Sequence, residues 1–360
     1  MARHRGNSAF VVLVTLFSHA SLAACSKKDN GPGEPRGTAG DAAAAPDPVD
    51  SIVNEAPPPL PSAGGAGGTT AMAKKGFDLH SSGCARGDAP ACVDLGIDYE
   101  QGRGTEADVA RAAALYQQGC TKGVASGCTD LGQLYDRGEG VVKDASQAAG
   151  FYRRGCDLAP APSPGGCNAL GIDYKDGVGV AADQARSAEL FKRACDLGSA
   201  DGCTNLGFMC STGRGVDQDG AKAIELYRKG CEAGSAQGCH NLAYRYENGV
   251  DVPKSERSAL ALYDKACSLG LAIGCNNMGG LYERGGDIPR DVDRAVRLYA
   301  EACARGDMTG CNNVGHMYEL GRGVAQDYAK AARYYKRACD GGVSLGCTNL
   351  GQLESTGKVK

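Results

Sequence analysis

Cysteine is the residue whose number and spacing in this chain suggest chemistry most directly. Of eighteen cysteines in 360 residues, sixteen form eight pairs that recur every 36 residues, or 39 where an insert lies. Seven pairs have the spacing C-x7-C, and the third is lengthened by the insert. Thiols at this density persist as disulfides only in an oxidising compartment. The pairs are Cys84 and Cys92, Cys120 and Cys128, Cys156 and Cys167, Cys195 and Cys203, Cys231 and Cys239, Cys267 and Cys275, Cys303 and Cys311, and Cys339 and Cys347.

The regular interval predicts the elements that position the cysteines, because a fixed period of this size is typical of stacked helical hairpins. A first predicted helix, helix A, begins near the second cysteine of each pair. It carries a leucine, a glycine and a tyrosine on one face, as in Leu95, Gly96 and Tyr99. The glycine predicts close approach of a neighbouring helix. It recurs at Gly132, Gly171, Gly207, Gly279 and Gly315.

A second predicted helix, helix B, follows a glycine-rich turn and ends at the first cysteine of the next pair. Its expected N-cap is a residue whose side-chain oxygen can accept a backbone N–H. These caps are Asp108, Asp144, Asp183, Asp219, Ser255, Asp291 and Asp327.

Each cysteine pair therefore spans one turn between a helix B and the next helix A. Antiparallel neighbours bring such positions within the Cα separation of about 4.4–6.8 Å that a disulfide needs. In a different register, Cys92 would bond to Cys120, because the start of helix A and the end of helix B also lie at one end of a hairpin. That register leaves Cys84 and Cys347 without partners. We therefore predict eight bridges within the pairs, each worth about 2.5 kcal/mol in the chain-entropy model.

The repeat resembles the Sel-one-like repeat (SLR), a relative of the tetratricopeptide repeat. The pattern L-G-x-x-Y-x-x-G-x-G-V…D-x-x-K-A-x-x-L-Y-x-K-A-C-x-x-G…G-C is nearly complete in residues 206–239 and 314–347, and the C-x7-C version resembles the cysteine-rich Hcp proteins. The resemblance covers about residues 72–356. It implies an all-α fold, a right-handed α/α superhelical solenoid of disulfide-stapled hairpins with a concave groove. It also implies one of two functions, protein scaffolding or slow hydrolysis of β-lactams.

The N-terminal residues predict export and lipid attachment. A short basic stretch precedes an apolar run over residues 9–17, which is too short to span a membrane. The run leads to Leu22-Ala23-Ala24-Cys25, which resembles a bacterial lipobox. The resemblance implies cleavage before Cys25 and a diacylglycerol thioether on its sulfur. An ordinary signal peptidase site after Ala23 is the alternative.

These segments predict four parts: a signal peptide over residues 1–24, a lipid-anchored linker over 25–70, the solenoid over 71–356 and a tail over 357–360. The Gly-, Pro- and Ala-rich linker is not expected to bury a core. We expect a monomer in the bacterial cell envelope, on the outer membrane, facing the periplasm or the surface. Its lipid is the expected membrane contact. A net charge of −3 argues against a nucleic-acid partner.

The residues argue against a cofactor, a metal site or a catalytic set. Zinc needs cysteine or histidine at short spacing, and neither C-x-x-C nor H-E-x-x-H occurs. Ser355 and Lys358 match the S-x-x-K of serine β-lactamases by letters, but they fall where other repeats have a glycine turn, so we interpret the match as chance. A β-lactamase-type hydrolase stays the alternative by resemblance alone. Cys210 replaces the helix A tyrosine and is predicted to be a buried, inert thiol, with a mixed disulfide as the alternative.

Three rows of helix A residues vary between repeats and are predicted to line the groove for a protein or peptide partner. The first row follows the glycine, the second follows the second cysteine, and the third follows the tyrosine position. The third row is mostly acidic, which favours a peptide with basic flanks. The candidate groove residues are Ile97, Gln133, Ile172, Phe208, Tyr244 and His316 in the first row, His240, Asn276 and Asn312 in the second, and Glu247, Glu283 and Glu319 in the third.

An asparagine also recurs immediately before the helix A leucine. We predict that its side chain bonds a neighbouring turn and satisfies backbone groups at helix ends, with a ligand role as the alternative. It stands at Asn205, Asn241, Asn277, Asn313 and Asn349, with Asp94 and Asp130 at the corresponding places in the first two repeats.

Overall fold

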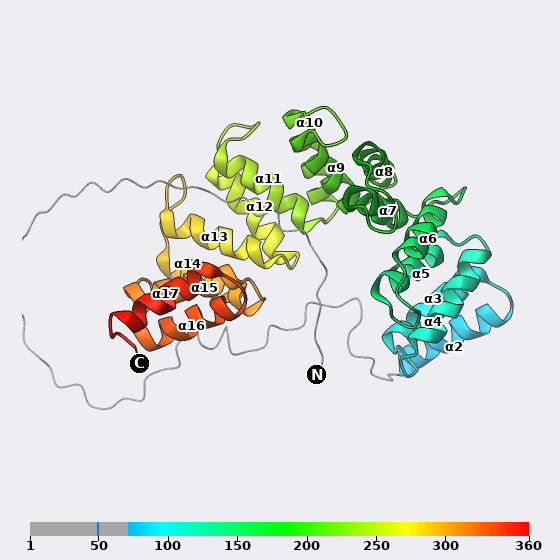
Figure 1. The fold of residues 1–360 in the computed structure, drawn as a ribbon, viewed down its shortest axis with the longest axis horizontal. Coiled ribbons are helices and arrows are strands. Elements are labelled where there is room, and N and C mark those ends of the chain that lie inside the picture. Colours follow the sequence, from blue (N-terminus) through cyan, green and yellow to red (C-terminus); the bar gives the residue numbers. More distant parts are fainter. Residues whose placement is uncertain (1–48, 50–70, 360) are drawn as a thin grey trace, which may run out of the picture. The chain divides into compact units, whose positions relative to one another are not determined.

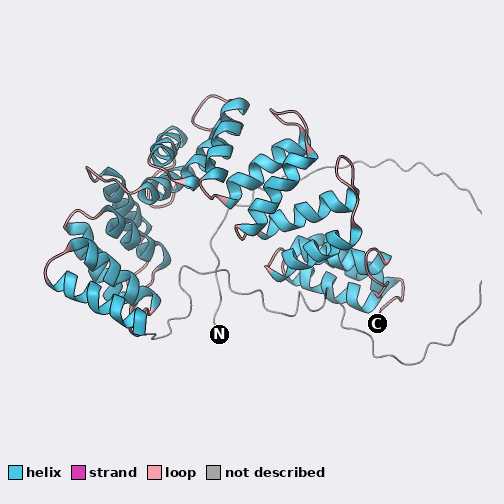
Figure 2. Ribbon diagram, turned by 180° about the vertical axis from the view of Figure 1, so that it is seen from behind, coloured by secondary structure: helices cyan, strands magenta, loops and turns pink. Residues whose placement is uncertain are grey.

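The computed structural model describes residues 71–359 and Val49 (Figure 1). The predicted signal peptide, Cys25 and the rest of the predicted linker lie outside the described residues. Residues 71–359 form sixteen α-helices and no strand (Figure 2). The helices are α2 (Ala71–Ala85), α3 (Ala89–Gln101), α4 (Val109–Thr121), α5 (Ala125–Arg137), α6 (Ala145–Asp157), α7 (Pro164–Asp176), α8 (Gln184–Asp196), α9 (Ala200–Thr212), α10 (Gly220–Glu232), α11 (Ala236–Asn248), α12 (Glu256–Ser268), α13 (Ala272–Arg284), α14 (Val292–Ala304), α15 (Met308–Leu320), α16 (Tyr328–Asp340) and α17 (Ser344–Ser355).

The two predicted helix types alternate along the chain. Odd-numbered helices are helix A, even-numbered helices are helix B, and each packs against the helix before it and the helix after it (Figure 1). Each helix B and the following helix A make one hairpin, from α2 with α3 to α16 with α17. The prediction of an all-α solenoid built from eight helical hairpins is therefore confirmed.

Short-range chemistry explains where the helices begin and end. At the start of α4, the Asp108 carboxylate accepts a hydrogen bond from the Arg111 backbone N–H. The other six predicted caps of helix B accept the equivalent bond, so this prediction is confirmed. Helix A commonly ends at a glycine in the left-handed region, such as Gly102 with φ 67°. Glycine adopts this conformation without the steric cost of a Cβ atom.

All eight predicted disulfides are present, with Cα–Cα separations of 4.5–4.8 Å. Each joins the end of a helix B to the next helix A. Cys92 is bonded to Cys84 and Cys120 to Cys128, so the alternative register is wrong. Disulfides at this density are typical of an oxidising, extracytoplasmic environment.

The helix A glycines allow helix B rings to pack closely, as predicted. A Cβ atom at Gly96 would lie 2.6 Å from Cε1 of Tyr116, and one at Gly132 would lie 2.7 Å from Cε1 of Tyr152. The largest continuous hydrophobic cluster spans α11 to α17 and also contains Val49. Within the described residues, every helix is too short or too polar to cross a membrane.

Candidate interaction surface

One row of helix A side chains stays accessible to solvent along the described repeats. Ile172 is 38% exposed, Gln133 and His316 are exposed, and Phe208 and Tyr244 are half-buried. Aromatic side chains that keep part of their surface exposed are enriched at protein interfaces. We call this set the accessible row, and it contains all the predicted groove residues of the first row. Its members are Ile97, Gln133, Ile172, Phe208, Tyr244, Gly280 and His316.

Asparagine side chains connect several successive helices A on one side of the accessible row: α7 with α9, α13 with α15, and α15 with α17. Asn205 Nδ2 donates to Asn168 Oδ1 at 2.9 Å, although 37 residues separate them. The prediction of a repeated hydrogen bond is confirmed, but the partner is a side chain of the preceding helix A, not a turn. We call this set the asparagine ladder. The same bond joins Asn313 to Asn276 at 2.9 Å and Asn349 to Asn312 at 3.0 Å.

The asparagine ladder corrects part of the predicted groove. Asn276 and Asn312 are buried, so they do not line an exposed surface. His240 takes the same place in its repeat, and its Nε2 accepts from Asn277 Nδ2 at 3.0 Å. Burial lowers the pKa of His240, which favours the neutral ring that this acceptor role requires. The second predicted row therefore holds neighbouring helices together.

Carboxylates on the other side of the accessible row are held by tyrosines of helix B. Tyr263 donates its hydroxyl to Glu247 at 2.7 Å, and burial together with this bond raises the pKa of Tyr263 well above its usual range. Each such tyrosine lies 16 residues after its acceptor, within one A–B pair. The equivalent bonds join Tyr116 to Glu100, Tyr152 to Asp136, Tyr299 to Glu283 and Tyr335 to Glu319.

Cations from the following repeat complete these contacts and form what we call the carboxylate ladder. Arg137 Nη2 donates to Glu100 Oε1 at 2.6 Å, and Arg284 pairs with Glu247. Further along, Glu283 lies 3.6 Å from Arg322. Glu319 lies 3.7 Å from Lys358. The carboxylates of the third predicted row are therefore not free, because tyrosine hydroxyls and cations already engage them, and the role of this row in a groove stays a prediction. Sequence reasoning missed these partners.

The carboxylate ladder stops in the middle repeats. Lys175 and Ser211 stand where the other repeats carry an acidic residue. Tyr227 donates its hydroxyl only to Ser211, at 3.2 Å, and Phe191 replaces the tyrosine of α8. In these repeats, the accessible row consists of Ile172 and Phe208.

The middle repeats also contain a buried carboxyl that the predictions missed. Asp173 is 5% exposed, and its Oδ2 is buried without a hydrogen-bond partner. Burial, helped by the charges of Asp136 and Asp176, raises its pKa to about 7. The signal was present in the sequence, because the corresponding position in most other repeats is apolar, as at Leu134.

Cys210 is the described cysteine without a disulfide, and it is 7% exposed. Burial, and then the charge of Asp219, raise the pKa of its thiol. A thiol with a raised pKa is a poor nucleophile near neutral pH. Its position agrees with the predicted buried thiol.

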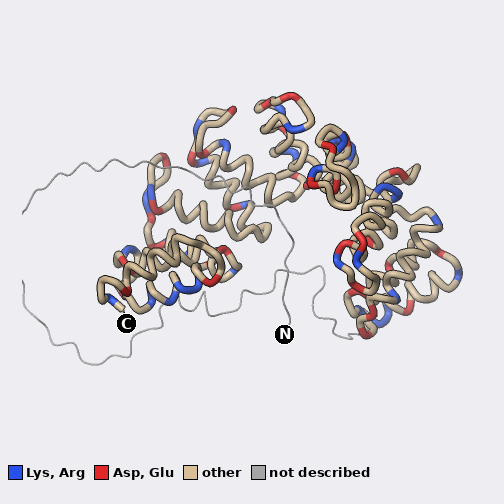
Figure 3. Tube along the Cα trace, viewed as in Figure 1, with Lys and Arg blue, Asp and Glu red and all other residues tan. Residues whose placement is uncertain are grey.

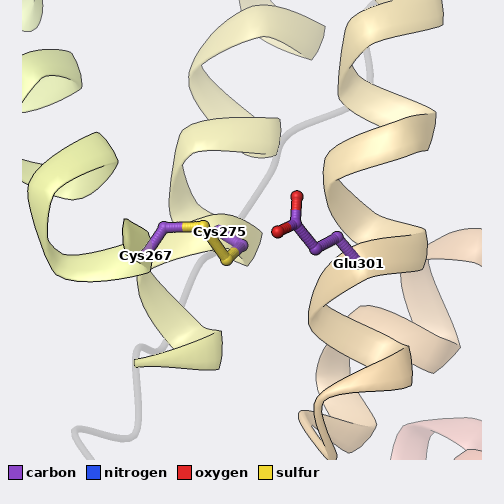
Figure 4. A group of neighbouring side chains, drawn as sticks. All are labelled: Cys267, Cys275 and Glu301. Carbon is purple, nitrogen blue, oxygen red and sulfur yellow. A yellow bond between two sulfur atoms is a disulfide. The ribbon is translucent and has the colours of Figure 1, made fainter. Parts of the chain in front are cut away.

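Among the described residues, one group has the ligand types and proximity of a metal site: Cys267, Cys275 and Glu301 (Figure 4). The two sulfurs are bonded to each other, however, so neither is available as a thiolate ligand. The Glu301 carboxylate pairs with Arg305 at 2.6 Å. The group is therefore a disulfide beside an ion pair.

The two residues of the S-x-x-K match also have other partners. The Ser355 hydroxyl donates to the Gln352 carbonyl at 3.1 Å, within its own helix. Lys358 Nζ lies 3.7 Å from Glu319 and 4.7 Å from the centre of the Tyr328 ring. This geometry does not set a lysine base against a serine nucleophile. Acidic and basic residues are interspersed along the described chain (Figure 3), which agrees with the mixed composition.

Comparison with known protein families identifies the repeat. The Sel1 repeat family matches residues 89–124, 125–160, 164–199, 200–235, 236–271, 272–307 and 309–343. Each match contains a helix A and the following helix B. Helices α2 and α17 lie outside the matches and flank them. Comparison with curated proteins finds no match.

Solved structures with the same fold include two long matches. One is c5321, a protective antigen of uropathogenic Escherichia coli strains displaying an SLR fold, with 25% identity, a TM-score of 0.60, and coverage of 85% of this chain and 67% of that chain. Another is a Sel1 repeat protein from Oxalobacter formigenes, with 23% identity, a TM-score of 0.60, and coverage of 78% and 80%. Helicobacter pylori cysteine rich protein B is 30% identical over 36% of this chain and 94% of that chain, with a TM-score of 0.31.

Proposed function

The chain belongs to the Sel1 repeat family, and we propose that it is a scaffold that binds a protein or peptide partner along the accessible row of helix A. The observation that carries this proposal is the contrast among the three rows. The outer two rows are engaged in ladders, whereas the row between them keeps isoleucine and aromatic surface available.

Hydrogen bonds on both sides of Phe208 support the proposal because they fix this part of the surface before a partner arrives. Asn205 and Ser211 lie three residues before and after Phe208, on the same face of α9. Bonds from these flanking positions hold the helix to its neighbours, at 2.9 Å for Asn205 and 3.2 Å for Ser211. A surface fixed in this way loses little conformational entropy on binding. Because the carboxylates are engaged, apolar contact should contribute more to binding than attraction of a basic peptide.

The proposed location is the bacterial cell envelope, with a lipid on Cys25. The eight disulfides support an extracytoplasmic location, and the lipobox resemblance supports the anchor. Replacing Cys25 with alanine should move the protein from the membrane fraction to the soluble fraction and remove incorporated labelled palmitate. Membrane retention of Cys25→Ala would contradict the anchor and leave the binding proposal intact.

Site-specific photo-crosslinking in the envelope tests the surface directly. A benzophenone amino acid at Phe208 or Tyr244 should give discrete crosslinked products. The matched controls are the exposed helix B positions Lys229 and Asp264, which lie in the same two A–B pairs. Equal crosslinking from the helix A and helix B positions would overturn the proposal.

A variant separates binding from folding. Replacing Phe208 and Tyr244 together with alanine should abolish crosslinking from a benzophenone at Ile172, the next member of the accessible row. The helical circular dichroism should be unchanged, because both aromatic residues are only half-buried. Undiminished crosslinking would show that the two aromatic side chains do not carry the contact.

A further inference from the structure

Val49 precedes the repeats in the sequence, yet its side chain is buried against them. Its side chain is 1% exposed, and it belongs to the hydrophobic cluster formed by α11 to α17. It also belongs to the same compact unit as those helices. A residue of the predicted linker therefore has a binding site on the C-terminal repeats.

Two pockets show what kind of site this fold offers on the helix B side. A pocket of about 310 Å³ lies between α10, α11 and α12. A second pocket, of about 230 Å³, lies between α6, α7 and α8, and several of its lining residues occupy equivalent positions. The first pocket is lined by Arg228, Cys231, Glu232, Leu242, Tyr246, Ser258, Leu262 and Lys265.

The equivalent position between α14, α15 and α16 is more apolar and is covered. Ala300 replaces Arg228, Val314 replaces Leu242 and Tyr334 replaces Leu262, whereas Tyr318 keeps the tyrosine of position 246. All four of these residues are buried and belong to the same cluster as Val49.

The burial of Ala300 in α14 indicates most clearly that another segment covers this position. Ala300 is 0% exposed, although it occupies an outward-facing place near the end of helix B. In each of the other helices B from α4 to α16, the residue at the equivalent position is exposed. Those residues are Gln117, Arg153, Lys192, Arg228, Asp264 and Lys336.

We propose that the apolar surface between α14, α15 and α16 binds residues 46–53 of the same chain, with Val49 as the apolar anchor. Charge complementarity supports this occupant. Asp47 and Asp50 flank Val49 in the sequence, and α16 carries Lys330, Arg333 and Arg337. The inference is independent of the proposed partner surface, which lies on helix A.

Hydrogen exchange of the full-length oxidised protein tests the docking. Backbone amides of residues 49–53 should exchange at least tenfold more slowly in the wild type than in Val49→Asp, which replaces the apolar anchor with a charged side chain. Leu60→Asp, elsewhere in the predicted linker, is the matched control and should have no effect on residues 49–53. Exchange of these amides at the unprotected rate in the wild type would overturn the proposal.

A substitution in α14 tests the repeat side of the contact with Val49. Ala300→Arg restores a long side chain like that of Arg228 and should also remove the protection of residues 49–53. Ala261→Arg is its control, because it adds the same side chain at an exposed position of α12. Protection that persists in Ala300→Arg would place the segment elsewhere and contradict binding between α14, α15 and α16.

Dilution distinguishes docking within one chain from exchange between two copies. Protection by the same chain should be independent of protein concentration over a hundredfold range. Protection that falls on dilution would identify a second copy as the occupant and overturn the intrachain proposal. Crosslinking from Phe208 should be unaffected by Val49→Asp, so the two proposals succeed or fail separately.

Discussion

The C-terminal repeats and the middle repeats are built from the same unit but are held together differently. From α11 to α17, one hydrophobic cluster is continuous, and both ladders link successive helices A. From α7 to α10, the carboxylate ladder is missing, and Asp173 and Cys210 occupy buried positions. The comparison shows that the period specifies the helices, whereas a few side chains per repeat set how firmly neighbours are joined.

This difference matters because a solenoid has no single central core. Each repeat contacts only its neighbours, so its stability is close to a sum of local terms. Loss of a ladder in one repeat therefore weakens that part without unfolding the rest. We expect the middle repeats to open at a lower free energy than the C-terminal repeats.

Reduction of the disulfides should have the largest effect. Each bridge closes a short loop worth about 2.5 kcal/mol, so full reduction should lower the Tm by more than about 10 °C. Hydrogen exchange after reduction should increase first in α7–α10 and last in α11–α17. The measurements are calorimetry and exchange in the presence and absence of a phosphine reductant. Loss of protection first in α11–α17 would contradict the comparison.

Replacing Asp173 with asparagine should strengthen the middle repeats in a pH-dependent way. The folded pKa of Asp173 is about 7, above the ordinary value of 3.8, so the folded state binds its proton more tightly than the unfolded state. Its contribution to stability is fully present below about pH 4 and is lost as the pH rises through 7. Asp173→Asn should therefore match the wild type near pH 4 and be more stable at pH 8, by on the order of 4 kcal/mol. Urea unfolding at both pH values checks this, and an equal difference at both would refute the titration.

The tyrosine bonds provide a matched pair of variants. Tyr263→Phe removes a bond to a carboxylate at 2.7 Å, whereas Tyr227→Phe removes a bond to the neutral Ser211 at 3.2 Å. Bonds to charged groups contribute about 1.5–3 kcal/mol, and neutral ones about 0.5–1.5 kcal/mol. The loss of unfolding free energy should be larger for Tyr263→Phe. Equal losses would mean that the carboxylate ladder adds nothing to the C-terminal repeats.

The asparagine ladder should give the smallest effect. Asn313→Ala removes the bond to buried Asn276 and should cost about 1 kcal/mol. Asn241→Ala is the control, because the Asn241 oxygen accepts from Gln237 within its own helix at 2.7 Å. Chemical denaturation of the two variants measures the difference. A control variant as destabilised as Asn313→Ala would remove the special role of the ladder.

The helices, caps and disulfides were predictable because each depends on residues that are close in sequence. Asp108 caps α4 through a residue three positions later, and Cys120 pairs with Cys128 across one turn. The ladders were harder to predict, since their partners lie 16 or 37 residues apart and meet only once the repeats have stacked. Glu247 therefore looked like part of a ligand surface when it is bonded to Tyr263. Asp173 could have been found by comparing the repeats position by position.

The local disulfides also determine how the protein responds to a pulling force. Because the sequence separation within a bridge is 8 and its Cα atoms lie 4.5 Å apart, the enclosed residues cannot extend while the bridge is intact. A 36-residue repeat would extend to about 125 Å when reduced but only to about 100 Å when oxidised, at roughly 3.5 Å per residue. The bridges thus limit the length that each yielding repeat releases under tension, and a partner bound to an intact neighbour would be displaced less.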